Sequence, residues 1–345
     1  MDGYSKPLVT TTNVNKDISP QLMSPRELNA LFNKIHLCYH HHGIWLNKDV
    51  AIGILHPGLL FQIHNNAQSL TISTPKGEFG LPLNNRDTVV ASLMAVGAII
   101  PGTATEVETI HHLLVNSIYS RSISYSLCFA DCCNQLLKAI ESINNIQMAF
   151  IGFGGIANHC LFNLAGSGFK HFILCDHDHV ESTNLNRQLL FTQTDVGESK
   201  VQVGKREILR RFPDCDITCY TNELNSCSRM DYLSHTDYIL ITADEPPGLV
   251  HNLLKQLVSS HCKACIILAG YSCNSAIIHE LDQQLPSPSF PWLRLTNSIM
   301  PSHGPINAEL GAKVAEAVYQ RVCHFSSSKP LRFAQPLNHF SIGFS

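Results

Sequence analysis

The residues best suited to chemistry in this sequence surround a glycine-rich turn in the second half of the chain. Gly152-Phe153-Gly154-Gly155 follows a short apolar run and precedes a helical pattern. Glycines at a strand-to-helix turn let the backbone approach a phosphate, and the helix N-terminus offers unpaired N–H groups. The turn therefore favours nucleotide binding, although similar turns occur in dehydrogenases, in methyltransferases and in α/β proteins with no ligand there.

An ordered set of polar residues follows the turn. Asp176 stands 24 positions after Gly152, at the end of the next expected strand, where a carboxylate can bind ribose hydroxyls of NAD or ATP. The segment Asn184-Leu185-Asn186-Arg187-Gln188 comes next, and Lys200 then opens an expected helix. Arginine offers phosphate oxygens a planar fork of donors, and lysine adds a mobile positive charge. The set suits cleavage of ATP between its α and β phosphates better than it suits hydride transfer.

The elements that must position these residues are indicated by hydrophobic pattern. From Gln147 onward, short apolar runs alternate with helical patterns, which predicts an α/β fold with a Rossmann-like, doubly wound, mostly parallel sheet. The expected strands are 148–152, 171–175, 217–220, 238–242 and 265–269. The expected helices are 157–167, 199–211 and 248–261.

Residues 1–105 are expected to form a small α+β module. Ser24-Pro25-Arg26-Glu27 has the form of a helix N-terminus, and the expected helix continues to about Cys38. Extended runs follow at 44–55, 59–64, 69–74 and 79–83. A sheet with an exposed edge can bind an extended peptide by strand addition, and the alternative is a purely structural extension. Residues 106–146 are expected to be helical and to link this module to a domain at 147–345.

The ordered set resembles the E1-like superfamily, which includes ThiF, MoeB and the ubiquitin-activating enzymes. The similarity covers roughly residues 147–320 and rests on GxGG, DxDxVxxxNLxRQ, GxxK and Asp244 after a later strand. It implies an ATP-dependent enzyme that adenylates carboxylates, with Mg²⁺ held by Asp244. The ATP-binding residues that it implies are Gly152, Gly154, Gly155, Asp176, Asp178, Asn184, Arg187, Gln188 and Lys200.

Within the superfamily, the chain is most similar to members that modify ribosomally made peptides. These include the microcin C7 synthetase and, in overall layout, the pantocin A-forming enzyme; shared stretches include GGIANH, GESK and AGY. The resemblance implies that residues 1–105 form a winged-helix-like module that binds a precursor peptide. It also implies dehydrative cyclisation through activated glutamate side chains, in antibiotic biosynthesis.

Those relatives are homodimers that pass an arginine into the neighbouring active site. Arg121 in Arg121-Ser122-Ile123-Ser124-Tyr125 matches that element, although an arginine on a solvated helix face is the alternative. The expected catalytic residues are Arg187, Lys200, Asp244 and Arg121.

The chain departs from the family in its cysteines. Many members bind zinc through two Cys-x-x-Cys pairs, whereas this sequence has the single pair Cys262 and Cys265, so no zinc is expected. Cys227 and Cys273 are further candidates for a covalent nucleophile, but no cysteine has a recognisable nucleophile context.

Three other functions stay open on the sequence alone. The chain could activate the C-terminus of a ubiquitin-like sulfur carrier, act as an NAD(P)-dependent oxidoreductase, or serve as a non-catalytic scaffold. The missing zinc pairs argue against the first, the Asn184–Gln188 segment against the second, and the full polar set against the third.

The composition of the chain argues against several further classes of function. A net charge of −3 gives no basic surface for nucleic acid. Thirteen cysteines without a secretory signal indicate a cytoplasmic protein with free thiols and no membrane span. We expect His40-His41-His42 to be a surface or interface cluster, and Gln283–Pro291 to be an irregular surface loop.

Overall fold

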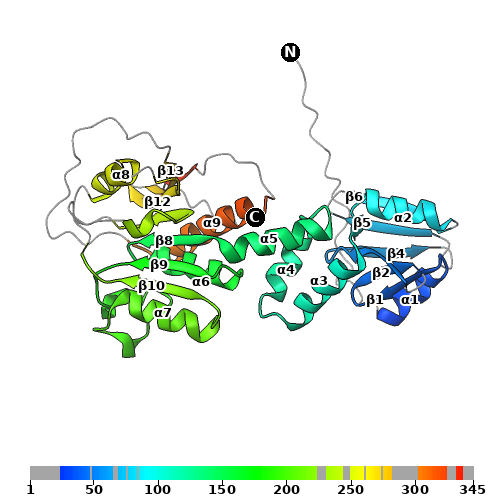
Figure 1. The fold of residues 1–345 in the computed structure, drawn as a ribbon, viewed down its shortest axis with the longest axis horizontal. Helices are drawn as coiled ribbons and strands as arrows, with labels where there is room; N and C mark the ends of the chain where they lie inside the picture. Colours follow the sequence, from blue (N-terminus) through cyan, green and yellow to red (C-terminus); the bar gives the residue numbers. More distant parts are fainter. Residues whose placement is uncertain are drawn as a thin grey trace, which may run out of the picture. The chain divides into compact units, whose positions relative to one another are not determined.

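The structure is a computed structural model that separates the chain into two compact units, residues 1–107 and residues 108–345 (Figure 1). Each unit has its own hydrophobic core. The residues that the structure describes are 24–46, 49–64, 69–74, 77–83, 85–223, 231–243, 249–259, 262–272, 275–281, 302–324 and 332–336.

The first unit is an α+β module with two antiparallel sheets. One sheet has the order β1-β2-β3-β7 and the other the order β4-β5-β6. The expected run 44–55 is divided between two strands, and the sequence analysis missed β1, β7 and α2. The elements are α1 (Pro25–Asn33), β1 (Leu37–His40), β2 (Gly43–Leu46), β3 (Val50–Leu55), β4 (Leu60–His64), β5 (Ser69–Thr74), β6 (Gly77–Pro82), α2 (Arg86–Ala95) and β7 (Ile99–Pro101).

Local capping explains where the two helices of this unit begin. At α1 the Glu27 N–H donates to Ser24 Oγ, and the Ser24 N–H donates to the Glu27 carboxylate, which forms the expected capping box. At α2 the Asn85 side chain accepts from two backbone N–H groups. Neither this second cap nor helix α2 was expected from the sequence.

The His40-His41-His42 cluster lies at the β1–β2 turn. His41 and His42 have φ of 49° and 57° and connect the paired residues His40 and Gly43. All three histidines are exposed, so the cluster is on the surface as expected.

Three helices cover the stretch that was expected to be helical. They are α3 (Ala104–Asn116), α4 (Ser120–Leu127) and α5 (Cys133–Asn145). Within the described part of the chain, no helix is both long enough and apolar enough to cross a membrane.

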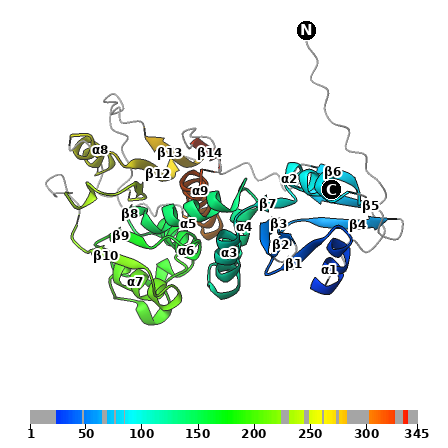
Figure 2. The same cartoon turned by 45° about the vertical axis from the view of Figure 1, so that its right-hand side comes forward.

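The second unit is built on a seven-stranded sheet of order β10-β9-β8-β11-β12-β13-β14 (Figures 1 and 2). The strands from β10 to β12 are parallel, and β13 and β14 add an antiparallel edge. This arrangement confirms the expected doubly wound, mostly parallel sheet. The strands are β8 (Gln147–Ile151), β9 (His171–Cys175), β10 (Asp216–Tyr220), β11 (Tyr238–Ile241), β12 (Cys265–Ser272), β13 (Ser275–Leu281) and β14 (Arg332–Pro336).

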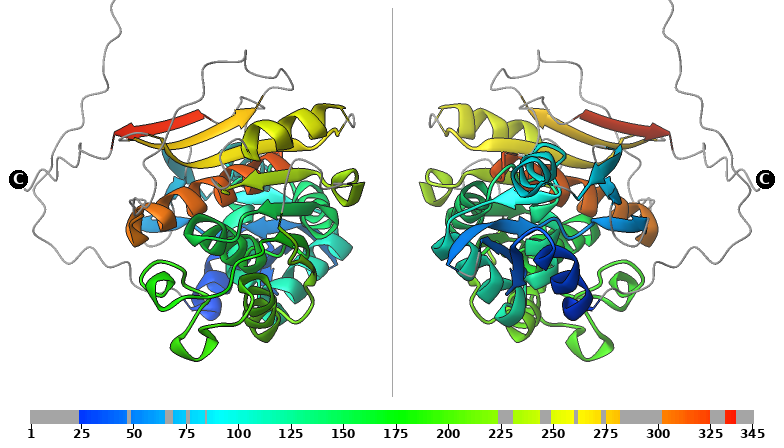
Figure 3. Two further views of the ribbon diagram at one scale, coloured as in Figure 1. Left: turned by 90° about the vertical axis from the view of Figure 1, so that its left-hand side faces the viewer. Right: turned by 90° about the vertical axis from the view of Figure 1, so that its right-hand side faces the viewer.

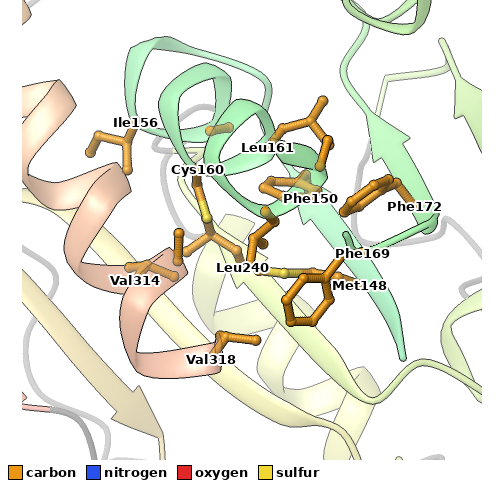
Figure 4. Close-up of a cluster of buried hydrophobic side chains, with 14 of the residues drawn as sticks. Met148, Phe150, Ile156, Cys160, Leu161, Phe169, Phe172, Leu240, Val314 and Val318 are labelled. Atoms are coloured by element: carbon orange, nitrogen blue, oxygen red, sulfur yellow. The ribbon is translucent and has the colours of Figure 1, made fainter. Parts of the chain in front are cut away.

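Helices cover both faces of this sheet. The helices are α6 (Gly155–Gly166), α7 (Lys200–Arg211), α8 (Leu249–Ser259) and α9 (Gly304–Val322). Alternate residues of β8 belong to different cores: Met148 and Phe150 pack with α6 and α9, whereas Ala149 and Ile151 pack with α8. Figure 4 shows the first of these clusters, and Figure 3 shows α8 and α9 on opposite sides of the strands.

The sequence analysis did not identify α9, β13 or β14. Helix α9 carries its buried residues at helical spacing, at Ile306, Leu310, Val314, Val318 and Val322. The signal was therefore present, and Pro305 at the start of the helix is compatible with it.

Candidate active site

The candidate site lies at the carboxyl ends of the parallel strands, next to β8. The chain runs outward from β8 through β9 to β10, and then returns to place β11 on the other side of β8. A reversal of this kind leaves a crevice outside the strand ends, which is where open α/β sheets bind ligands. The glycine turn follows β8 at this point.

The three glycines of the turn have different structural demands. Gly152 has φ of +85°, and a Cβ there would lie 2.6 Å from the backbone nitrogen of Ala243. A Cβ on Gly155 would lie 2.8 Å from Cγ of Asn307, in α9. A Cβ on Gly154 would meet nothing within 4 Å. The backbone is therefore packed closely at the first and last glycines and open at Gly154, which is the N-cap of α6.

The Asp176 carboxylate is held against this turn by backbone N–H groups. Phe153 N donates to one oxygen at 2.6 Å, and Asp178 N donates to the other at 2.8 Å. The side chain is thus fixed beside the glycine turn and remains partly exposed. Each oxygen has a second lone pair that can accept a hydrogen bond from a hydroxyl.

Lys200 reaches the same region from the start of α7. Its Nζ donates to Asp178 Oδ2 at 2.7 Å, and its backbone N–H donates to the Asp178 carbonyl at 3.0 Å. The lysine side chain is 10% exposed and the Asp178 side chain 53% exposed. His177 Nε2 lies 3.5 Å from the other oxygen of Asp178. A buried positive charge therefore lies beside an accessible carboxylate.

Arg187 lies on the segment that packs against the start of α6. Its Nη1 donates to the Thr183 carbonyl at 2.7 Å and to Asn186 Oδ1 at 3.0 Å. Among the residues that the structure describes, no carboxylate forms an ion pair with it. Its charge is therefore held in place by neutral acceptors, and it can pair with an anionic ligand.

Asn184 and Gln188 lie on the same segment and are both buried. Asn184 Oδ1 accepts a hydrogen bond from Glu181 N at 3.1 Å, so this side chain stabilises the helical turn Ser182–Asn184. Gln188 is 3% exposed, and its Oε1 has no hydrogen-bond partner among the described residues. A buried amide oxygen without a partner is costly and is suited to a donor supplied by a ligand or by water.

Two expected site residues are not brought to this cluster by the described structure. Asp244 lies outside the described residues. The chain just before it lies beside the turn, because Thr242 Oγ1 donates to the Gly152 carbonyl at 3.0 Å.

Arg121 is exposed on α4. Its neighbour Ser122 donates to the carbonyl of Gly166, at the end of α6 remote from the glycine turn. Helix α6 is 12 residues long, so its two ends lie roughly 17 Å apart. Arg121 therefore does not reach the turn of its own chain.

Three further residues shape the site and were missed in the sequence. Asn158 is fully buried under the glycine turn, and Asn307 is buried against Gly155. Tyr271, at the end of β12, donates from its hydroxyl to Asn307 Oδ1 at 2.7 Å. A polar residue on the apolar face of an expected helix is the signal that would have identified Asn158. Asn307 could not be identified as a site residue from the sequence, because helix α9, which contains it, was not recognised.

The single Cys-x-x-Cys pair does not form a ligand set in the described structure. Cys262 Sγ contacts the Leu233 carbonyl, whereas Cys265 Sγ accepts from Arg321 Nη1 at 3.6 Å. Burial, with a contribution from Glu280, raises the pKa of the Cys265 thiol to about 12, so the thiolate form is disfavoured. Cys227 and Cys273 lie outside the described residues, and the absence of zinc stays a prediction.

Comparison with protein families matches the ThiF family over residues 120–290. The sulfur carrier protein ThiS adenylyltransferase of Escherichia coli K12 is 33% identical over 31% of this chain and 43% of its own length. The NEDD8-activating enzyme E1 catalytic subunit of Caenorhabditis elegans is 39% identical over 23% of this chain and 19% of its own length. The chain thus spans less than half the length of these relatives.

Solved structures are similar over more of the chain. Escherichia coli MccB with ATP has a TM-score of 0.59 at 21% identity, and the match covers 82% of this chain and 96% of MccB. The microcin C7 biosynthetic enzyme MccB in complex with N-formylated MccA has a TM-score of 0.57 at 21% identity, with the same coverage. PaaA has a TM-score of 0.55 at 16% identity, over 73% of this chain and 91% of PaaA.

The coverage by MccB extends beyond the second unit, because residues 108–345 amount to only 69% of the chain (238 of 345 residues). The similarity in fold therefore includes part of the first unit. The resemblance to the E1-like superfamily is confirmed: residues 120–290 of this chain are a ThiF family domain, built on the E1-like fold.

Proposed function

We propose that this chain is an ATP-dependent adenylating enzyme that activates carboxylates of a ribosomally made peptide. The proposal is supported above all by three features that lie together at the carboxyl ends of the parallel strands. These are the open backbone at Gly154, the fixed carboxylate of Asp176, and the two cationic side chains of Lys200 and Arg187. Together they suit a nucleotide whose ribose binds the carboxylate and whose phosphates cross the turn.

The proposed reaction has two steps. In the first, a carboxylate oxygen of the peptide attacks the α-phosphorus of ATP, the bond to the β-phosphate oxygen breaks, and pyrophosphate leaves. Arg187 and Lys200 offset the negative charge on the leaving group. In the second step, a nucleophile of the peptide attacks the acyl carbon and AMP departs with the carboxylate oxygen. If the nucleophile is in the same peptide, the net change is a ring and the loss of one water.

Lys200 has to exchange its partner for this reaction. In the structure its ammonium group is paired with the Asp178 carboxylate. A phosphate that approaches the turn competes for the same ammonium group. Because Asp178 is half exposed, it can turn toward solvent or toward a cation when the lysine binds phosphate.

The donor chemistry near Lys200 also fits Mg²⁺. Asp176, His177 and Asp178 each offer one ligand atom, and these atoms lie within 4.8 Å of one another. Carboxylate oxygens are the ligands that Mg²⁺ prefers. We propose that Asp244 and Asp178 hold the ion, which when bound would neutralise charge on the phosphates, and that Asp176 binds the ribose.

We further propose that the enzyme acts as a homodimer and that Arg121 of each chain completes the site of the other. The support is the position of Ser122 at the remote end of α6, which separates Arg121 from the turn of its own chain. Tyr125 and Phe129, on and just after the same helix, are 40% and 45% exposed and contact each other at a ring distance of 4.9 Å. An exposed aromatic pair of this kind suits burial against a second chain.

The peptide substrate is supported by the layout that this chain shares with MccB, whose solved structures include complexes with ATP and with MccA. We propose that residues 1–105 bind the precursor peptide, and that the activated groups are glutamate side chains that cyclise with loss of water. Sulfur-carrier activation is the second candidate, because the matching relatives include a ThiS adenylyltransferase.

Incubation of the purified chain with ATP, Mg²⁺ and glutamate-containing candidate peptides tests the proposal. We expect AMP and pyrophosphate, and a peptide product whose mass is lower by one water for each ring. Formation of an acyl-adenylate on the C-terminal glycine of a sulfur carrier, with no change in any peptide, would favour the second candidate. Failure to bind ATP at all would rule out both.

A further inference from the structure

The side chain of Asn158 connects the two parts of the candidate nucleotide site. Its Nδ2 donates to the carbonyls of Phe153 and Gly154, at 3.2 and 3.1 Å. Its Oδ1 accepts from the backbone N–H of Leu190 at 3.3 Å. Asn158 is fully buried. One amide group therefore holds the glycine turn on one side and the segment that follows Arg187 on the other.

The chemistry of this link is specific to an amide. A primary amide offers donors and an acceptor in one planar group, and both kinds are used here. A carboxylate in the same place would set a negative oxygen against two carbonyl oxygens, although it could still accept from Leu190. A leucine of similar size would offer neither donor nor acceptor.

Neighbouring positions on α6 make further contacts with the same segment. A Cβ on Gly155 would lie 3.2 Å from the carbonyl oxygen of Arg187. Burial lowers the pKa of the His159 imidazole, and a hydrogen bond to the Arg187 carbonyl opposes that shift. The start of α6 and the backbone at Arg187 thus form one packed unit, which the buried side chain of Asn158 joins through its hydrogen bonds.

We infer that Asn158 is a positioning residue that couples the glycine turn to Arg187. The inference rests on the proposed function, because it assumes that phosphates bridge these two parts of the site. Arg187 must lie at the correct distance from a phosphate bound over Gly154. Sites of this kind require placement within about 0.5 Å. Residues 153 and 190 are far apart in sequence, and the Asn158 side chain sets the spacing between their backbones.

The experiment compares Asn158→Asp and Asn158→Leu with Asn163→Asp as a matched control. Asn163 is on the same helix, and its Nδ2 makes an exposed hydrogen bond to the His159 carbonyl. Thermal unfolding first establishes that each variant is folded, and Asn158→Ser, which replaces the amide by a smaller polar hydroxyl group, is used in place of any variant that is not. Peptide-dependent ATP–pyrophosphate exchange is then measured. We expect kcat to fall by at least about tenfold in both Asn158 variants and to be unchanged in the control.

A double-mutant cycle separates positioning from general destabilisation. If Asn158 acts through Arg187, Asn158→Asp will reduce exchange far less in an Arg187→Ala background than in the wild type. Equal fold-losses in both backgrounds would overturn the inference, as would normal exchange in the folded Asn158 variants. Wild-type protein that binds no ATP and shows no exchange would instead contradict the proposed function itself.

Discussion

Gly154 and Gly155 are adjacent in the sequence, yet they have opposite structural demands. Gly154 has room for a methyl group, whereas Gly155 packs against Asn307. Gly154→Ala should therefore cost at most about 1 kcal/mol of stability, the usual cost of alanine at an N-cap, and should weaken ATP binding because the new methyl group occupies the space assigned to phosphate. Isothermal titration with ATP measures this. Full ATP affinity in Gly154→Ala would show that the phosphates do not cross the turn.

Gly155→Ala, by contrast, should lower the stability of the fold. Its methyl group meets the Asn307 side chain inside the packed interface of α6 and α9, so we expect a loss of stability of about 1–3 kcal/mol. Urea unfolding of the two alanine variants measures the difference. Equal stability of Gly154→Ala and Gly155→Ala would show that the α6–α9 interface can accommodate a methyl group at Gly155.

Lys200 offers a direct test of charge in the site. Lys200→Ala should reduce pyrophosphate exchange by about 10²- to 10³-fold, since it removes one stabilising group from the transition state. Lys205→Ala is the matched control, because Lys205 is on the same helix and only partly buried. The Lys200 variant should keep its fold, as its partner Asp178 is half exposed. Exchange equal to that of the control would remove Lys200 from the mechanism.

At the scale of elements, the loop before α7 is held by a buried carboxylate. Asp195 is 4% exposed and accepts hydrogen bonds from Thr192 and from Arg206 on α7. Burial raises the pKa of the Asp195 carboxyl, but the Thr192 hydrogen bonds and the charge of Arg206 outweigh it, and the net pKa is lowered. This carboxylate therefore fixes the loop that leads into Lys200.

The lowered pKa gives a definite pH dependence of stability. The contribution of Asp195 is complete above the unfolded-state pKa of about 4 and is lost as pH falls through the lower, folded-state pKa. Asp195→Asn should therefore cost about 1–3 kcal/mol at neutral pH. It should also flatten the loss of stability in acid, which urea unfolding at several pH values measures. An unchanged acid profile in the variant would mean that Asp195 carries none of this dependence.

The elements that the sequence predicted well are those with strong local signals. Strand β9 occupies its expected residues, because the four buried apolar residues Phe172–Cys175 follow His171 and end in a turn. The glycine turn and the start of α7 were also expected where they lie. By contrast, β14 pairs with β13 although a long stretch of chain separates the two strands, and nothing within β14 indicates that partner. Strand β13 pairs with the adjacent strand β12 and was overlooked.

The site was only partly predictable for the same physical reason. Asp176 and Lys200 could be proposed as site residues because one follows a strand and the other opens a helix, and Arg187 because it lies between them in a recognisable order. The pairing of Lys200 with Asp178, and the contact of Asn307 with Gly155, arise from tertiary packing between distant segments. No pattern within one element indicates such contacts.

At the scale of the whole molecule, the role proposed for Arg121 requires two chains for one complete site. Arg121→Ala and Arg187→Ala should each reduce pyrophosphate exchange by about 10²- to 10³-fold when tested alone, which leaves a residual rate that can be measured. When the two variants are mixed and allowed to exchange subunits, the heterodimer contains one site with both arginines. About a quarter of wild-type activity should then return, since half of the dimers are mixed and each has one working site. If no activity returns although mixed dimers form, Arg121 does not act in the partner's site.

The central claim is that this chain activates a peptide carboxylate with ATP. Peptide-dependent exchange of labelled pyrophosphate into ATP tests it most directly, because exchange requires reversible formation of an acyl-adenylate. We expect exchange that depends on the peptide, that is lost when the peptide's glutamates are replaced by glutamine, and that falls by about 10²- to 10³-fold in Lys200→Ala. Exchange that persists without any carboxylate substrate, or cleavage of ATP to ADP and phosphate in its place, would contradict the account.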